Sequence, residues 1–153
     1  GRNDLVVAKV ARDAETIAFY AQTRQPLTPH TDPQWMWLLI DADKNPATGW
    51  EGYDYILNRT IDGQHTWLEK KYRRLDLGKS RASRTRDRRQ PAHASCAAHC
   101  SRSACGRYHF SRLQWWDHAQ KTGDIMDVYI SGDAAPDARF NYRYSTAADR
   151  RAN

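Results

Sequence analysis

The stretch from Trp35 to Arg59, WMWLLIDADKNPATGWEGYDYILNR, decides the fold class of this chain. It opens with an apolar run that ends in two alternating acids, Asp41 and Asp43. A turn with proline and glycine follows, and then a second run of aromatic and apolar residues. Short apolar runs bounded by turn residues predict a strand, an acidic loop and a second strand.

The same pattern continues on both sides of this stretch. Alternating or continuous apolar runs, each bounded by turn residues, predict strands at 5–10, 16–23, 35–40, 52–58, 64–70, 124–131 and 139–144. Outside 73–112 no segment shows a helical period. The predicted fold is therefore all-β, an antiparallel β-sandwich, and 153 residues are enough for one such domain over 1–153.

Residues 73–112 depart from this pattern in composition and in charge. They hold eleven Lys and Arg against two Asp, a balance of +9, whereas the rest of the chain has a balance of −3. They also hold all three cysteines and almost no β-branched or large aliphatic residues. The net charge of +6 thus belongs to one segment, which we expect to be irregular or disordered, and we expect no nucleic-acid partner.

Three interpretations of this basic segment stay open. It has the residue types of a zinc site with irregular spacing, in His93, Cys96, His99, Cys100, Cys105 and His109. It also has the composition of a disordered insertion, because it offers little apolar surface to bury. The interpretation we favour is a stretch read out of frame, since permissible codons one nucleotide later restore strand-like runs. It predicts compensating insertions or deletions in the coding DNA near Arg73 and Arg112.

The acidic loop gathers oxygen ligands. Carboxylate and amide oxygens are the ligands that Ca²⁺ prefers, and the candidate metal ligands are Asp41, Asp43, Asn45, Glu51 and Asp54. The spacing is not that of an EF-hand, which needs glycine at the sixth loop position and glutamate at the twelfth. The alternative is a purely structural turn, in which Asp and Asn side chains accept hydrogen bonds from local backbone N–H groups.

Aromatic residues near this loop are candidate platforms for a sugar ring. The platform candidates are Trp50, Tyr53, Tyr55, Trp115 and Trp116; since neighbours in a strand point to opposite faces, only one of the last two is available, and Trp116 is chosen. Candidate hydrogen-bonding partners are Asn58, Arg59, Asp117, Arg139 and Asn141. Trp50 is the strongest platform candidate because it lies in a loop, whereas Trp35, Trp37 and Trp67 lie in strand patterns and are expected in the core.

Two blocks of the sequence carry a family resemblance. They are PLTPHTDPQWMWLLIDADKNPATGWEGYDYILNR and GDIMDVYISGDAAPDARFNYRY, and their most specific part is D-x-D-x-N-x-x-T-G-W-x-G-Y-D at Asp41–Asp54. Over 4–71 and 113–145 the chain resembles the family 9-type carbohydrate-binding modules of the DOMON-like β-sandwich class. The basic segment departs from that family completely.

The resemblance implies a non-catalytic carbohydrate-binding domain. It further implies a secreted or periplasmic setting, as the C-terminal module of a longer glycoside hydrolase or glycan-handling protein, with carbohydrate and the other domains of that polypeptide as partners. No apolar run approaches the roughly 20 residues that cross a bilayer, so no membrane partner is expected. We expect no enzyme activity of this domain alone, because no Ser–His–Asp, HExxH, P-loop or GxGxxG pattern appears.

Other classes of function remain as alternatives. One is a glycoside-hydrolase-associated domain whose acids contribute to a neighbouring active site. Another is a structural domain with no ligand, in which all the aromatic residues are buried. A third is a nucleic-acid-binding protein that uses the basic segment, with steeply salt-dependent affinity.

Overall fold

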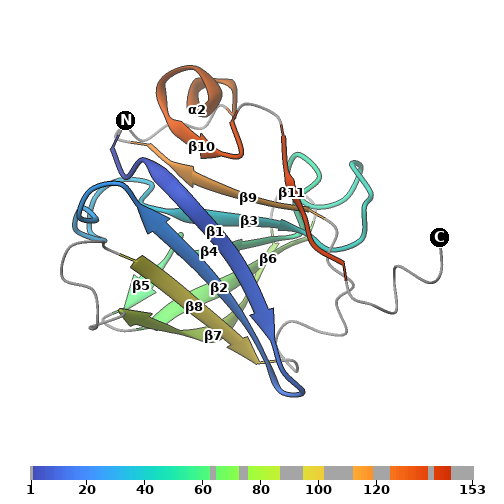
Figure 1. Ribbon diagram of the computed structural model, residues 1–153. Coiled ribbons are helices and arrows are strands. Elements are labelled where there is room, and N and C mark those ends of the chain that lie inside the picture. The colour runs from blue at the N-terminus through green and yellow to red at the C-terminus, as the bar shows by residue number, and fades with distance from the viewer. Residues whose placement is uncertain are drawn as a thin grey trace.

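A computed structural model describes most of the chain and shows an all-β fold. The described residues are 2–62, 65–72, 76–86, 95–101, 112–118, 125–137 and 140–145. Within them the backbone forms mostly antiparallel strands and a single short helix (Figure 1). The elements are β1 (Leu5–Arg12), β2 (Thr16–Thr23), β3 (Trp37–Asp41), β4 (Tyr55–Leu57), β5 (Ile61–Asp62), β6 (His65–Tyr72), β7 (Asp76–Arg86), β8 (Ser95–Ser101), β9 (Arg112–Asp117), α2 (Ile125–Ser131), β10 (Asp133–Ala135) and β11 (Tyr142–Arg143).

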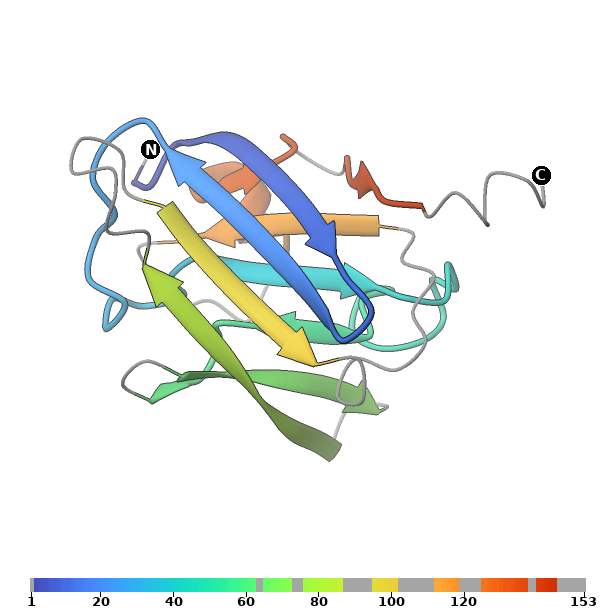
Figure 2. The ribbon, with the colours of Figure 1, turned by 60° about the horizontal axis from the view of Figure 1, so that its bottom comes forward.

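All the strands belong to one continuous sheet that curls over on itself. The order across the sheet is β1-β2-β8-β7-β6-β4-β3-β9-β10, with β5 paired to β6 and β11 paired to β9. Strands β1, β2 and β8 cross over the strands β9, β3 and β4 (Figures 1 and 2). The two ends of the order come together, because β1 contacts β10.

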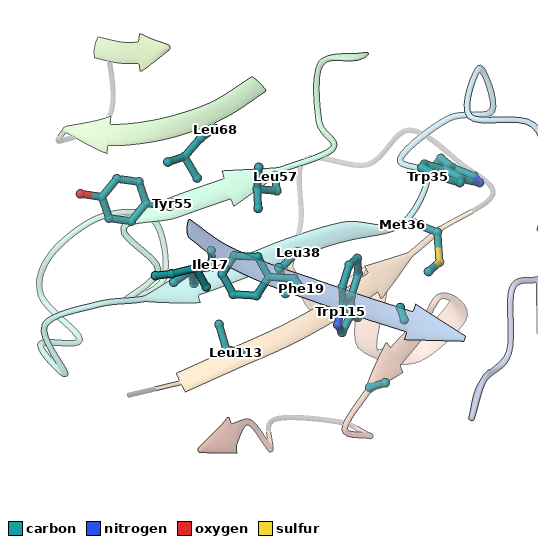
Figure 3. Close-up of a cluster of buried hydrophobic side chains, with 13 residues drawn as sticks. Ile17, Phe19, Trp35, Met36, Leu38, Tyr55, Leu57, Leu68, Leu113 and Trp115 are labelled. Atoms are coloured by element: carbon teal, nitrogen blue, oxygen red, sulfur yellow. The ribbon is translucent and has the colours of Figure 1, made fainter. Parts of the chain in front are cut away.

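The main core fills the space between the two halves of the curled sheet. Alternate residues of β2, among them Ile17 and Phe19, point inward because successive side chains of a strand lie on opposite faces. They meet Leu38 of β3 and Leu113 and Trp115 of β9 (Figure 3). We call this the inner cluster.

A second apolar cluster lies on the other face of β3, β4 and β9. It contains Leu39, Ile56 and Trp116, and Tyr129 of α2 packs against it. We call it the outer cluster. Strand β3 is therefore covered on both faces, which explains why its sequence is apolar without alternation.

Several sequence predictions are confirmed and several are wrong. Strand β2 has the predicted bounds, and β1 extends two residues beyond its prediction. The strand predicted at 124–131 is wrong, because Ile125–Ser131 is helix α2. Of the strand predicted at 139–144, the described residues contain only the two-residue strand β11. No helix in the described part of the chain is long and apolar enough to span a membrane.

The expectation of an irregular or disordered basic segment is wrong for its described parts. Strands β7 and β8 pair with each other, and they join β6 to β2 within the sheet. The physical reason is that a sheet ladder uses backbone N–H and C=O groups, which residues of any side chain except proline supply. Of the suggested zinc ligands, His93, Cys105 and His109 lie outside the described residues, so the zinc interpretation stays a prediction.

Candidate functional site

The acidic loop, residues 42–54 between β3 and β4, is shaped by a chain of side-chain-to-backbone hydrogen bonds. Asp41 Oδ1 accepts from Lys44 N at 2.7 Å, Asp43 Oδ1 from Asn45 N at 2.8 Å, and Asn45 Oδ1 from Ala47 N at 3.0 Å. These are the local bonds that make Asp and Asn frequent in turns. Asp54 likewise accepts from Ala42 N, so the structural role suggested by the sequence is present for four of the five candidate ligands.

Three carboxylates also converge at the base of the loop. Oxygens of Asp41, Asp43 and Asp54 all lie within 4.8 Å of one another. Burial raises the pKa of the Asp54 carboxyl, the N–H of Ala42 partly offsets this by donating to Asp54 at 2.8 Å, and the nearby charge of Asp43 raises the pKa further. A bound cation would relieve this repulsion. Glu51, the remaining carboxylate of the predicted set, is not part of this group.

Arg112 of β9 already partners the most buried of these carboxylates. Asp41 is 0% exposed, lies opposite Arg112 in the β3–β9 register, and accepts hydrogen bonds on Oδ2 from the Arg112 guanidinium. A buried carboxylate needs such a partner to remain charged. A cation at the loop would therefore share Asp41 with Arg112. Sequence reasoning missed this role, because Arg112 was counted as part of the anomalous basic segment.

A polar cavity of about 390 Å³ opens beside this pair. It lies where the acidic loop, β9 and α2 approach one another, and its lining residues are Glu51, Gly52, Tyr53, Arg112, Met126, Tyr129 and Asn141. Three of them, Glu51, Tyr53 and Asn141, were candidate site residues from the sequence. Met126 and Tyr129 were missed because the helix that carries them was predicted as a strand.

The Tyr53 hydroxyl joins the cavity to the sheet beneath it. It lies 2.8 Å from Gln114 Oε1 and 2.8 Å from Asn141 Oδ1. One O–H group donates to one acceptor at a time, so the bond can alternate between these two amides. Burial raises the pKa of the Tyr53 phenol, so the hydroxyl, which is protonated at neutral pH in any case, remains a donor further into the alkaline range.

Four aromatic rings form the floor on which this site rests. Trp116 makes edge-to-face contacts with Trp50, Tyr53 and Tyr129 at centroid distances of 5.4, 6.5 and 5.7 Å. Offset and edge-to-face pairs are favoured arrangements of aromatic rings. Because Trp116 is only 2% exposed, its ring serves packing and offers no open face for a stacked sugar. Its prediction as a platform is wrong in this structure.

Other predicted platforms are also packed inside the fold. Tyr55 and Trp115 belong to the inner cluster, so neither presents a face to a ligand at this site. Trp50, the one tryptophan of the acidic loop, is half-buried against the outer cluster and is therefore only partly accessible to a ligand. Trp35 is buried as predicted, whereas Trp37 and Trp67 are only half-buried.

The predicted hydrogen-bonding partners are scattered. Asn141 lines the cavity, and Arg139 lies outside the described residues. Asn58 is buried and donates from Nδ2 to Met36 O, and Arg59 pairs with Glu69 at 3.8 Å. Buried Asp117 accepts hydrogen bonds from Arg2 and Asn3, which fastens the start of the chain to the end of β9.

Comparison of the chain with protein-family models, with curated proteins and with solved structures finds no match.

Proposed function

We propose that this chain is a DOMON-like β-sandwich domain that binds carbohydrate without catalysis, in the cavity between the acidic loop, β9 and α2. The observation that carries the proposal is the cavity of about 390 Å³, which is lined by charged and amide groups together with Tyr53 and Tyr129, whose rings pack on Trp116. The motif behind the family resemblance, Asp41–Asp54, supplies one wall of this cavity.

The chemistry of the lining suits a sugar. Hydroxyl groups both donate and accept hydrogen bonds, so a sugar needs both kinds of partner. Glu51 accepts, Arg112 donates, and Asn141 does both. Met126 and Tyr129 supply apolar surface for the C–H face of a pyranose ring. Ligand sites typically measure about 300–1,000 Å³, so this cavity fits one or two sugar rings better than a long chain.

Calcium is proposed as a partner of the loop and not of the sugar itself. Three converging carboxylates, with the amide of Asn45 in the same turn, supply the oxygen ligands that Ca²⁺ takes. A cation there would hold the loop that carries Glu51 and Tyr53. On this view the metal raises sugar affinity by ordering the cavity wall.

The small number of carboxylates that line the cavity favours binding over hydrolysis. Glycosidases need a pair of carboxyl groups on either side of the scissile bond. Among the lining residues that the structure describes, Glu51 is the single carboxylate. The setting of the domain, as a secreted or periplasmic module of a larger glycan-handling polypeptide, follows from the family resemblance and is proposed with it.

The proposal is tested by titrating the full chain with a panel of mono- and disaccharides in a calorimeter. We expect Glu51→Gln to weaken the best ligand about tenfold, because a charged acceptor becomes a neutral amide. Glu15→Gln, in the exposed turn between β1 and β2, is the matched control and leaves affinity unchanged. A panel with no binder, or equal affinity in wild type and Glu51→Gln, would overturn the proposal.

Calcium is tested in the same instrument with and without a chelator. Asp43→Asn keeps an oxygen acceptor for the turn but removes one charge from the group of three carboxylates. If the ion orders the loop, the chelator and this variant both weaken sugar binding and their effects do not add. Unchanged affinity after chelation removes calcium from the proposal and leaves the sugar site standing.

A further inference from the structure

A second cavity, of about 190 Å³, borders the inner cluster between β1 and β11. Its floor is made by alternate, inward-pointing residues, Phe19 of β2 and Leu113 and Trp115 of β9. Its two walls are made by consecutive residues: Ala8–Val10 of β1 form one, and Tyr142 and Arg143 of β11 with the next residue, Tyr144, form the other. We call the space between these walls the seam.

Consecutive residues line a cavity when a strand presents its edge to it. Successive side chains alternate between faces, so a strand that lines a cavity with one face contributes every second residue. Ala8 and Val10 pack on the inner cluster, whereas the Lys9 ammonium lies on the other face, 5.9 Å from the Tyr20 ring. Lys9 can therefore reach the seam mainly through its backbone.

Both walls are strand edges. Within the described residues β1 pairs with β2 alone, and β11 pairs with β9 alone. Both views place β1 and β11 on the same side of β9 (Figures 1 and 2). An edge strand carries a row of N–H and C=O groups that can pair with an added strand. The seam thus combines backbone pairing groups with an apolar floor.

The charged residues that line the seam are basic, although the charge of Asp137 also acts on Tyr142. Among its described lining residues Arg143 and Lys9 are charged and none is acidic, and the Lys9 ammonium lies on the outer face of β1, where it can meet only the outward side chains of an added strand. Arg143 also lies directly opposite Arg112 in the β9–β11 register. Asp41 already pairs with Arg112, and no ion pair within the described residues involves Arg143, so an acidic group beside Arg143 would be stabilising. The complementary occupant is therefore anionic as well as extended.

We propose that the seam is a docking site for an extended acidic peptide, which adds to the edge of β1 and places one aromatic or aliphatic side chain in the cavity. Strand addition of this kind takes its affinity from main-chain hydrogen bonds and its specificity from pockets for alternate side chains. The strand edges at the walls supply the main-chain hydrogen-bonding groups. The floor of Phe19, Leu113 and Trp115 supplies the pocket for a side chain. This site does not depend on the carbohydrate proposal, because it shares no lining residue with the polar cavity.

The probe is a fluorescein-labelled peptide in which glutamate alternates with valine around one central phenylalanine. Its binding to the full chain is followed by fluorescence anisotropy. Ala8→Leu extends a side chain into the cavity and is expected to weaken binding about tenfold or more. Ala11→Leu makes the same change on the exposed face of β1, and affinity stays within about twofold of wild type. Circular dichroism confirms that both variants are folded.

Two altered probes separate strand pairing from simple filling of the cavity. A peptide N-methylated at alternate residues along one edge keeps every side chain but loses the donors that a ladder needs, and it should bind about tenfold more weakly or worse. A peptide with lysine in place of glutamate should also bind weakly. Equal binding of the N-methylated peptide would show a pocket for small apolar molecules instead and overturn the proposal. Absence of binding by the first probe, or no effect of Ala8→Leu, would overturn it as well.

Discussion

Gly49 occupies a point in the acidic loop where no side chain fits. Its φ is +64°, and a Cβ built there would lie 2.0 Å from the carbonyl oxygen of Tyr53. This close approach is what allows Trp50 and Tyr53 to exchange backbone hydrogen bonds of 2.9 Å in both directions. The tight turn closed by these hydrogen bonds places Glu51 and Tyr53 at the cavity.

We predict that Gly49→Ala destabilises the fold by about 3 kcal/mol, through backbone strain together with the clash. Gly52→Ala is the matched control. Gly52 also has positive φ, +83°, but its added Cβ would meet nothing closer than Pro46 Cα at 3.2 Å. We expect this control to cost about 1 kcal/mol. Urea denaturation measures both, and equal losses would mean that the contact with Tyr53 is unimportant.

Asp133 at the start of β10 makes stability depend on pH. Burial raises the pKa of its carboxyl, and the nearby charge of Asp4 adds to the effect. A carboxyl with a raised folded-state pKa binds its proton more tightly when folded, so its contribution is fully present below the unfolded pKa of about 3.9 and is lost as pH rises through the folded pKa. Neutral Asn has no such dependence.

Asp133→Asn should therefore be more stable than wild type at pH 7, and the difference should shrink towards acid pH. Urea denaturation at a series of pH values measures the difference. Asp13→Asn is an informative control, because hydrogen bonds from the Glu15 and Thr16 N–H groups lower the pKa of Asp13 and predict the opposite trend with pH. A difference for Asp133→Asn that grows on acidification would contradict the prediction.

At the scale of elements, the pair of Asp41 and Arg112 joins β3 to β9 beside the cavity. Asp41 is 0% exposed, whereas the Arg112 side chain is 41% exposed. Removing Arg112 would leave a buried carboxylate without its cationic partner. Removing both charges avoids that cost.

We predict that Arg112→Met destabilises the protein by about 2–4 kcal/mol, and that the double variant with Asp41→Asn recovers most of the loss. The amide of Asn can still accept the loop hydrogen bond that Lys44 N donates to Asp41. Urea denaturation of the two single variants and the double variant gives the coupling energy. A double variant as unstable as Arg112→Met would show that the arginine acts through packing alone.

The hydrophobic periodicity of a segment predicts its secondary structure well when one face of the segment is buried. It predicts poorly when contacts with distant parts of the fold determine whether the segment is a strand or a helix. Thr16–Thr23 alternates strictly, and β2 has these bounds. The run DIMDVYIS is short enough to suit either a strand or a helix. Packing of Tyr129 on the outer cluster settles it as a helix, with Ile130 left exposed. No sequence signal reports that contact.

At the candidate site, too, alternation predicts part of the arrangement and tertiary packing determines the rest. Neighbouring Trp115 and Trp116 point to opposite faces, as alternation requires. Both are nevertheless buried, because the curled sheet covers one face of β9 while α2 and the acidic loop cover the other. The sequence places Glu51, Tyr53 and Asn141 among the candidates, but the cavity they share depends on α2.

At the scale of the whole molecule, the basic segment holds the sheet together. Strands β7 and β8 stand between the β1–β2 hairpin and β6, so the order of the sheet is broken without them. Composition argued against any ordered element there, because it considers only what side chains bury. Backbone pairing does not distinguish a native segment from one read out of frame. Whether the basic segment is read out of frame is decided by the coding DNA, in which we predict compensating insertions or deletions near Arg73 and Arg112.

Strand β8 lies between β2 and β7 in the interior of the sheet. Ala98 lies opposite Phe19 of β2 and Arg84 of β7, so its backbone belongs to a strand paired on both sides. Ala98→Pro removes an N–H from this ladder and should cost about 3 kcal/mol or more, since proline is tolerated only at sheet edges and bulges. Ala98→Val keeps the N–H and has high strand propensity, so it serves as the control. Limited proteolysis of the proline variant should release the β1–β2 hairpin from the rest of the fold. Equal resistance of the two variants would mean that β8 does not hold this hairpin to the sheet.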